Sequence, residues 1–185
     1  MGSPAATGCP PVDVRPLTSS LIRFSDAGPE DAAAIARLHT EVSEDLTTRF
    51  GKGHWSQQST ERGALFAMRH ARVVTARSRG RIIAVARLAT KKPWAIDISY
   101  FTPCKRPLYL TGMAVRPDRQ GQGIGRRLVE ELVQVAREWS GDAIRLDAYD
   151  AKAGAGGFYA KGGFTCRGHA SYKGTPLVYY ELLLR

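Results

Sequence analysis

Residues 108–127 read LYLTGMAVRPDRQGQGIGRR, a stretch in which a strand pattern, a glycine-rich turn and the start of a helix follow one another. Residues 108–115 are predicted as a strand and residues 120–125 as the turn. From Ile124 onward, apolar residues recur every three or four positions, which predicts a helix. The sequence therefore places the end of a strand, a tight turn and a helix N-terminus side by side.

The turn has the composition of an anion-binding site. The first N–H groups of a helix have no partner within the helix, and the helix dipole makes that end positive. Glycines at 121, 123 and 125 leave room for a ligand to approach these amides. The same glycines are also compatible with nothing more than a tight turn. The surrounding cations favour the phosphate or pyrophosphate site; they are Arg116, Arg119, Arg126 and Arg127.

Two common nucleotide-binding loops do not fit this stretch. A dinucleotide fingerprint requires a third glycine at the position that Arg126 occupies. A nucleoside-triphosphate loop ends in Gly-Lys-Ser/Thr, whereas this chain has Gly125-Arg126-Arg127. Both loops are therefore excluded.

The rest of the chain predicts a mixed α/β fold, because strand and helix patterns alternate. The other predicted elements are a strand at 21–24, a helix from Pro29 through Leu46, a helix at 58–68, a hairpin of strands at 72–76 and 81–88, a strand at 143–149, a helix at 153–160, and strands at 164–172 and 177–184. Prolines bracket residues 94–101, so this segment is either a loop or an edge strand. We expect a disordered lead-in over residues 1–20 and one domain over residues 21–185.

Composition limits the function classes. Hydrophobic residues make up 43% of the 185 and charged residues 24%, as in an ordinary globular protein. No apolar run approaches the roughly 18 residues of a membrane helix, and the first twenty residues lack the apolar centre of a signal peptide. The three cysteines show neither metal-ligand nor disulfide-framework spacing. We expect a cytoplasmic protein with neither a membrane partner nor a metal.

Two motifs resemble those of the GNAT acetyltransferase family. Gln120-x-x-Gly123-x-Gly125 is similar to that family's Gln/Arg-x-x-Gly-x-Gly/Ala pattern. Phe158-Tyr159-x-x-x-Gly163-Phe164 is similar to its downstream Phe-Tyr-x-x-x-Gly-Phe block, at a matching distance. The resemblance implies a mixed, mostly antiparallel sheet with flanking helices and a central strand–turn–helix acyl-CoA site. It also implies acetyl-CoA as the acyl donor.

The same resemblance assigns roles to residues. The backbone of residues 113–115 would pair with the pantetheine arm and polarise the thioester carbonyl, and Tyr159 would be the general acid. The implied cofactor-binding residues are Met113, Ala114, Val115, Gln120, Gly121, Gln122, Gly123, Ile124, Gly125, Arg126, Lys152 and Tyr159. Lys152 departs from the family, which often has asparagine there. Lysine can reach a phosphate, but it cannot accept a hydrogen bond.

An amine acceptor must lose a proton, usually to a carboxylate. We rank Glu41 and Asp97 first as the catalytic base, because their segments are expected to border an acceptor pocket. The other carboxylates considered are Glu44, Asp45, Asp147 and Asp150, and for any single one of the six an ordinary surface charge is the more common interpretation. The pair His54-Trp55 either lines an acceptor pocket or anchors a loop.

The predicted function is transfer of an acetyl group from acetyl-CoA to a small-molecule or peptide amine. Direct attack within a ternary complex is expected, because the sequence shows no activated nucleophile. Two alternatives stay open: an acyl-CoA sensor, and a basic nucleic-acid-associated module without turnover. The net charge of +10 suits polyphosphate ligands.

A basic run from Arg69 to Lys92 is expected to form the solvated face of the predicted hairpin. It lacks the interleaved aromatic residues of single-strand binders, so a nucleic-acid partner is not expected. A monomer and a homodimer are both compatible with the sequence.

Overall fold

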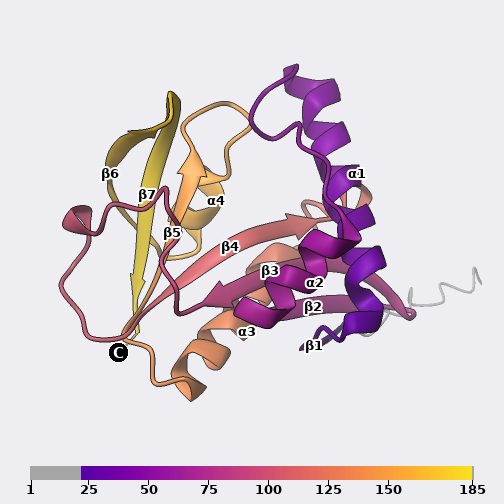
Figure 1. The fold of residues 1–185 in the computed structure, drawn as a ribbon, viewed down its shortest axis with the longest axis horizontal. Coiled ribbons are helices and arrows are strands. Elements are labelled where there is room, and N and C mark those ends of the chain that lie inside the picture. The colour runs from indigo at the N-terminus through magenta and orange to yellow at the C-terminus, as the bar shows by residue number, and fades with distance from the viewer. Residues whose placement is uncertain (1–21, 185) are drawn as a thin grey trace, which may run out of the picture.

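The computed structural model describes residues 22–184, which form a seven-stranded sheet with helices on both faces (Figure 1). The predicted lead-in, residues 1–20, lies outside the described residues. The strands are β1 (Arg23–Asp26), β2 (Arg72–Ser78), β3 (Arg81–Ala89), β4 (Pro107–Val115), β5 (Ala143–Tyr149), β6 (Thr165–Tyr172) and β7 (Thr175–Leu183). The helices are α1 (Ala32–Phe50), α2 (Glu61–His70), α3 (Ile124–Glu138) and α4 (Gly156–Lys161), with short 3-10 turns at Pro29–Asp31, Ile98–Tyr100 and Pro117–Arg119.

The sheet has the order β1-β2-β3-β4-β5-β7-β6, and every neighbouring pair except β4–β5 is antiparallel. The predicted mixed, mostly antiparallel fold is therefore confirmed. The segment 94–101 is a loop with one 3-10 turn rather than an edge strand. The last helix begins at Gly156 instead of residue 153, because the chain first makes a tight turn in which Gly154 N–H donates to the Ala151 carbonyl.

Side chains of successive strand residues enter different layers, as the two-residue period of a strand requires. Val74 packs with Leu128 and Leu132 of α3 on one face of the sheet. Its neighbour Val73 packs on the other face, with Ile35 of α1 and Met68 of α2. Because helices cover both faces, β2 and β3 lie in the interior of the fold.

The basic run is solvated only in part. The exposed members are Arg69, Arg79, Arg81, Lys91 and Lys92. Arg72 forms ion pairs with Asp26 and Glu138, and Arg77 pairs with Asp31. Arg87 is half-buried. These three arginines therefore differ from the exposed members of the run, because Arg72 and Arg77 are paired with carboxylates and Arg87 is half-buried.

The parallel pair β4–β5 is short, and this feature creates the site. Pairing covers only residues 107–109 of β4 and 143–145 of β5. Beyond Tyr109 the two strands separate, and Figure 1 shows β5 leaving with β7 and β6 while β4 stays beside β3. Residues 110–115 of β4 consequently have no strand partner on that side among the described strands.

A β-bulge marks the place where β4 leaves β5. Pairing with β3 shifts between Val85 and Arg87, so that Gly112 and Met113 together oppose one residue of β3. Gly112 has φ +56°, a conformation that favours glycine. A side chain at this position would overlap the guanidinium of Arg87.

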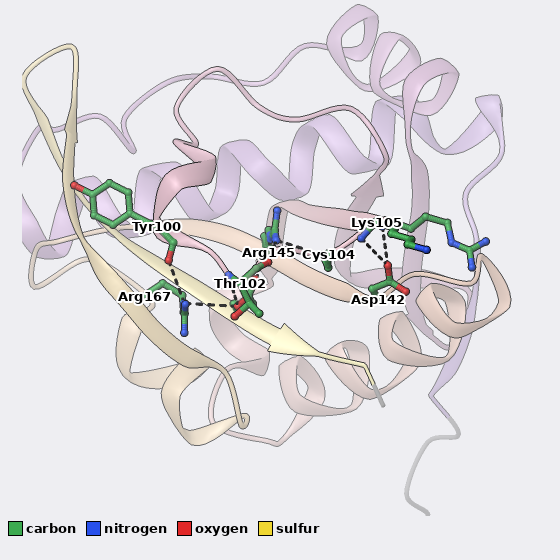
Figure 2. A network of polar contacts seen from close by, with 9 residues as sticks. Tyr100, Thr102, Cys104, Lys105, Asp142, Arg145 and Arg167 are labelled. Atoms are coloured by element: carbon green, nitrogen blue, oxygen red, sulfur yellow. Dashed lines mark hydrogen bonds and ion pairs between the residues drawn. The ribbon is translucent and has the colours of Figure 1, made fainter.

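Polar contacts stabilise the end of the sheet where β4 and β5 are still paired, which we call the closed end (Figure 2). The carboxylate of Asp142, just before β5, accepts hydrogen bonds from the backbone N–H groups of Lys105 (3.0 Å) and Arg106 (2.8 Å), just before β4. The carboxylate of Asp142 therefore holds the start of β5 next to the start of β4.

A buried ion pair connects β5 to β7 near the same end of the sheet. Arg145 of β5 contacts Glu181 of β7 at 3.0 Å, and their side chains are 5% and 2% exposed. Arg145 also donates to Cys104 Sγ at 3.3 Å, and Arg167 of β6 lies 3.6 Å from Glu181 (Figure 2). The network connects three strands to the segment that leads into β4.

Candidate active site

A cleft opens where β4 and β5 separate. It consists of two connected hollows of about 490 and about 430 Å³. We call the first the turn side, because the glycine turn and the start of α3 line it, and the second the loop side, because the α1–α2 loop lines it. The residues that line both are Val42, Leu46, Met113, Ala114, Ala153, Ala155 and Tyr159.

The turn side presents unbonded backbone amides. Gly121 and Gly123 have φ +73° and +76°, so the chain turns sharply into α3, and no side chain caps the helix. The Arg127 N–H donates to the Gly123 carbonyl at 3.1 Å, which leaves the three preceding amides of α3 without a helical acceptor. This end of the cleft therefore has the geometry of an anion site.

Two of the four predicted arginines face this site, namely Arg119 and Arg126. The Arg126 side chain is 79% exposed and pairs with Glu130 on its own helix. Arg116 instead pairs with Asp118 at 3.0 Å. Arg127 lies over the ring of Phe24, 5.3 Å from its centre.

The predicted cofactor residues mostly gather here. All of them line the turn side except Gln122 and Lys152. The Gln122 side chain donates to the Asp118 carbonyl at 3.1 Å, and Lys152 is exposed in the turn before α4. Gly125 packs closely, since a methyl group on it would lie 3.2 Å from the ring of Phe158.

Tyr159 of α4 lies between the two sides of the cleft. It is 7% exposed and packs against the rings of Phe158, Phe164 and Tyr180. Its hydroxyl donates to Met113 Sδ at 3.6 Å. Burial, together with the charge of Asp147, raises the pKa of Tyr159 above its usual range. The phenol therefore keeps its proton at neutral pH and has only a weak acceptor for it.

Asp147 is the carboxylate of the loop side. It lies on β5 beyond the point of separation and is half-buried. Burial raises the pKa of Asp147, because it disfavours the ionised form. A carboxyl group with a raised pKa is a stronger base once it is ionised.

The α1–α2 loop covers the loop side. The His54 ring stacks on Tyr149 with ring centres 6.2 Å apart, and Trp55 meets the same tyrosine edge-on at 6.0 Å. Ser43 of α1 donates to the Trp55 carbonyl at 2.6 Å. Both interpretations of His54-Trp55 therefore hold, because these residues line the cleft and also anchor the loop.

The two carboxylates ranked first from sequence do not line the cleft. Glu41 borders a separate hollow, 3.9 Å from Arg116 Nε. Asp97 caps the 3-10 turn at Ile98–Tyr100 and accepts hydrogen bonds from the N–H and hydroxyl of Ser99, which lower its pKa.

Two residues near the cleft were not among the candidates taken from the sequence. His39 lines the loop side, and the guanidinium of Arg87 packs against Gly112, which also lines it. His39 lies four residues after Ile35 along α1, and Arg87 interrupts the apolar run of β3. A polar residue inside an apolar pattern was the available signal in both cases.

Among residues 22–184, no group of three metal-binding side chains comes together. No helix in the same range is long and apolar enough to cross a membrane.

Comparison with known proteins gives one family and many related folds. The model of the acetyltransferase (GNAT) family matches residues 36–164. An N-acetyltransferase from Staphylococcus aureus Mu50 is similar in structure, with a TM-score of 0.66, 17% identity, and 90% of this chain and 100% of that chain covered. Comparison with curated proteins by sequence gives no match.

Two further solved structures have similar folds. yncA from Salmonella typhimurium, solved with its cofactor acetyl-CoA, has a TM-score of 0.63 and 19% identity, with 89% of this chain and 94% of that chain covered. The ribosomal-protein-S18-alanine N-acetyltransferase from Escherichia coli has a TM-score of 0.62 and 18% identity, with the same coverage of 89% and 94%. At these identities the likeness concerns the fold alone.

Proposed function

The chain belongs to the acetyltransferase (GNAT) family, and we propose that it transfers an acetyl group from acetyl-CoA to an amine acceptor within a ternary complex. One observation carries this proposal. The unpaired edge of β4, the open amides of α3, Tyr159 and Asp147 all border a single cleft. A family resemblance alone does not identify an acceptor.

The turn side suits the coenzyme. The first amides of α3, with Arg119 and Arg126 beside them, are placed to bind the pyrophosphate. The unpaired edge of β4 offers backbone groups with which the amides of a pantetheine arm can pair as an added strand does. A thioester held there has its carbonyl near the amides of residues 113–115, which would stabilise negative charge on the oxygen.

The loop side suits the amine. In the proposed reaction Asp147 takes a proton from the acceptor ammonium, and the neutral nitrogen attacks the thioester carbon. The C–N bond forms and the C–S bond breaks. Tyr159 donates its proton to the departing thiolate, and the second proton released by the new amide nitrogen returns to the Tyr159 phenolate, which restores the phenol. Asp147 is favoured over Glu41 and Asp97 because it lines the cleft and because its pKa is raised.

The remaining expectations concern two coenzyme contacts, the nucleic-acid alternative, the location and the oligomeric state. Lys152 and Gln122 stay predictions as coenzyme contacts, and their side chains do not line the cleft. The ion pairs of Arg72 and Arg77 leave little free basic surface on β2 for a nucleic acid. A cytoplasmic location, and the choice between a monomer and a homodimer, stay predictions.

Substitution Tyr159→Phe tests the proposed acid. It removes the proton donor while keeping the ring packing, so acetyl-CoA affinity should stay within about twofold. Thiol release with a panel of amines should fall by roughly 10²-fold or more, a typical loss for a general acid. Tyr180→Phe is the matched control, because this buried tyrosine packs 6.0 Å from Tyr159 and does not line the cleft.

Unchanged thiol release in Tyr159→Phe would remove this residue as the acid. Acetyl-CoA binding without thiol release for any amine would favour the sensor alternative over the enzyme.

A further inference from the structure

Arg87 is an unpaired cation under the bulge of β4. Its Nε atom is buried and has no hydrogen-bond partner, and the side chain makes no ion pair with any residue in 22–184. The guanidinium packs against Gly112, which lines the loop side of the cleft. Burial lowers the pKa of Arg87, but an arginine stays charged at neutral pH. A half-buried charge without a partner lowers the stability of the folded chain. A negatively charged ligand would supply the missing partner.

A hollow of about 220 Å³ lies beside this guanidinium, and we call it the arginine hollow. Its residues are Ile35, Ala36, His39, Gln58, Ser59, Thr60, Gly63, Ala64, Ala67, Met68, Val73 and Arg87. His39 and Ser59 also line the loop side, so the two spaces adjoin. Among the described residues that line it, Arg87 is the one charged side chain, apart from any charge on His39.

His39 does not add a second positive charge at neutral pH. Burial, and then the charge of Arg87, lower the pKa of His39 to about 4. The neutral ring can still donate one hydrogen bond. The hollow therefore combines a fixed cation with neutral polar groups, and none of residues 22–184 places a carboxylate in its lining.

The start of α2 adds to the positive potential. Thr60 caps this helix by accepting a hydrogen bond from the Gly63 N–H at 3.1 Å, and both residues line the hollow. The N-terminus of a ten-residue helix favours a negative charge nearby.

We infer that the acceptor is an amine that also carries a carboxylate, with the carboxylate bound by Arg87 and the amine directed toward Asp147. This inference rests on the proposed acetyl transfer and narrows its substrate class. A planar guanidinium matches a carboxylate in shape and charge. The same cation disfavours polyamines and other polycationic acceptors.

The test uses pairs of acceptors that share a side chain and differ in this charge, namely amino acids and the corresponding amino acid amides. In the wild type, kcat/KM measured by thiol release should be at least about tenfold higher for the acids. Arg87→Gln should remove the preference by raising KM for the acids about tenfold or more. Turnover of the amides and affinity for acetyl-CoA should not change, and Arg87→Lys should restore part of the preference.

Equal kcat/KM for acids and amides in the wild type would overturn the inference, as would an equal loss for both in Arg87→Gln. In either case the proposed acetyl transfer would still stand. Aminoalkyl phosphonates form a third arm, and a preference for them over carboxylates would also contradict the inference.

Two further readouts keep the outcomes separate. If acetyl-CoA binds but no amine releases thiol, the proposed function fails. Calorimetric titration with the same amino acids then decides the inference, which requires binding that weakens about tenfold in Arg87→Gln. Removing an unpaired cation should leave this variant at least as stable as the wild type in thermal melts. If it nevertheless misfolds, the acid–amide comparison in the wild type and in Arg87→Lys decides.

Discussion

In the proposed reaction Asp147 is the base and Tyr159 the acid, although burial acts on both side chains in the same direction. Burial raises the pKa of both side chains. For the phenol, this keeps the proton in place until a thiolate forms. For the carboxyl group, it moves the pKa toward the pH at which the enzyme works, so that the ionised form is a better base. In the proposed reaction Asp147 therefore accepts one proton from the amine, and Tyr159 donates a different proton to the thiolate.

Substitution Asp147→Asn should separate activity from stability. Turnover should fall by roughly 10²-fold, because the base is lost. The thermal stability of the variant should instead be higher than that of the wild type. Since the folded pKa of Asp147 is raised, the stabilisation that comes with its neutral form is present below the unfolded pKa and is lost as pH rises through the folded pKa. Asparagine stays neutral, so the variant should melt at a higher temperature than the wild type near pH 8, with the difference shrinking toward pH 4.

Thermal melts and thiol-release assays across this pH range check both effects. Asp150→Asn is the control, because Asp150 is exposed, pairs with His169 at 2.8 Å and does not line the cleft. Full turnover in Asp147→Asn would exclude this residue as the base.

At the scale of elements, the strand–turn–helix unit was predictable because its determinants are local. Apolar periodicity sets β4 and α3, and the glycines at 121 and 123 adopt the left-handed conformation that the turn needs. The acceptor side was not predictable in this way. Asp147 on β5 and His39 on α1 line the loop side of the cleft that opens where β4 and β5 separate, and Arg87 on β3 lines the adjoining arginine hollow. Residues this far apart in the chain meet only in the folded structure.

The ranking of Glu41 and Asp97 shows the same limit. Glu41 precedes the cleft-lining residue Val42 on α1, and Asp97 lies in the loop before β4. The direction of each side chain depends on the rotation of the helix or on the path of the loop. Glu41 turns toward Arg116, and Asp97 is held by Ser99. Neither contact could be anticipated from the spacing of charged residues.

The start of α3 gives a prediction that separates two adjacent arginines. Arg126 lines the turn side, whereas Arg127 lies over Phe24 outside the cleft. Arg126→Ala should weaken acetyl-CoA binding about three- to tenfold at low salt, with a smaller loss at high salt because the contact is exposed. Arg127→Ala should leave the affinity unchanged. Calorimetric titrations of both variants check this, and equal effects would contradict the assigned phosphate site.

At the scale of the whole molecule, the cleft depends on β4 and β5 staying paired at one end while they separate at the other. The buried Arg145–Glu181 pair, with Arg167 beside it, connects β5, β7 and β6 behind the junction with β4. The sequence could not reveal this pair, because the partners are separated by 36 positions and meet only through the β5–β7 register.

Substitution Glu181→Gln should destabilise the fold by about 3–5 kcal/mol, because it leaves buried Arg145 without its counter-charge. At a temperature where the variant is still folded, its acetyl-CoA affinity should match that of the wild type. Glu138→Gln is the control, since Glu138 pairs with Arg72 at the surface and should contribute less than about 1 kcal/mol. Denaturant unfolding measures both, and similar small losses would show that the buried pair does not hold the closed end.

The most direct test of the central claim is a calorimetric titration of acetyl-CoA into the wild type and into Gly125→Leu. Gly125 lies against Phe158 and Met113 in the lining of the turn side, so a leucine there would occupy the proposed path of the coenzyme. We predict one site per chain with a dissociation constant below about 100 µM in the wild type, and loss of that binding in a folded Gly125→Leu variant. Absence of binding in the wild type at millimolar acetyl-CoA, or equal affinity in the two proteins, would contradict the account.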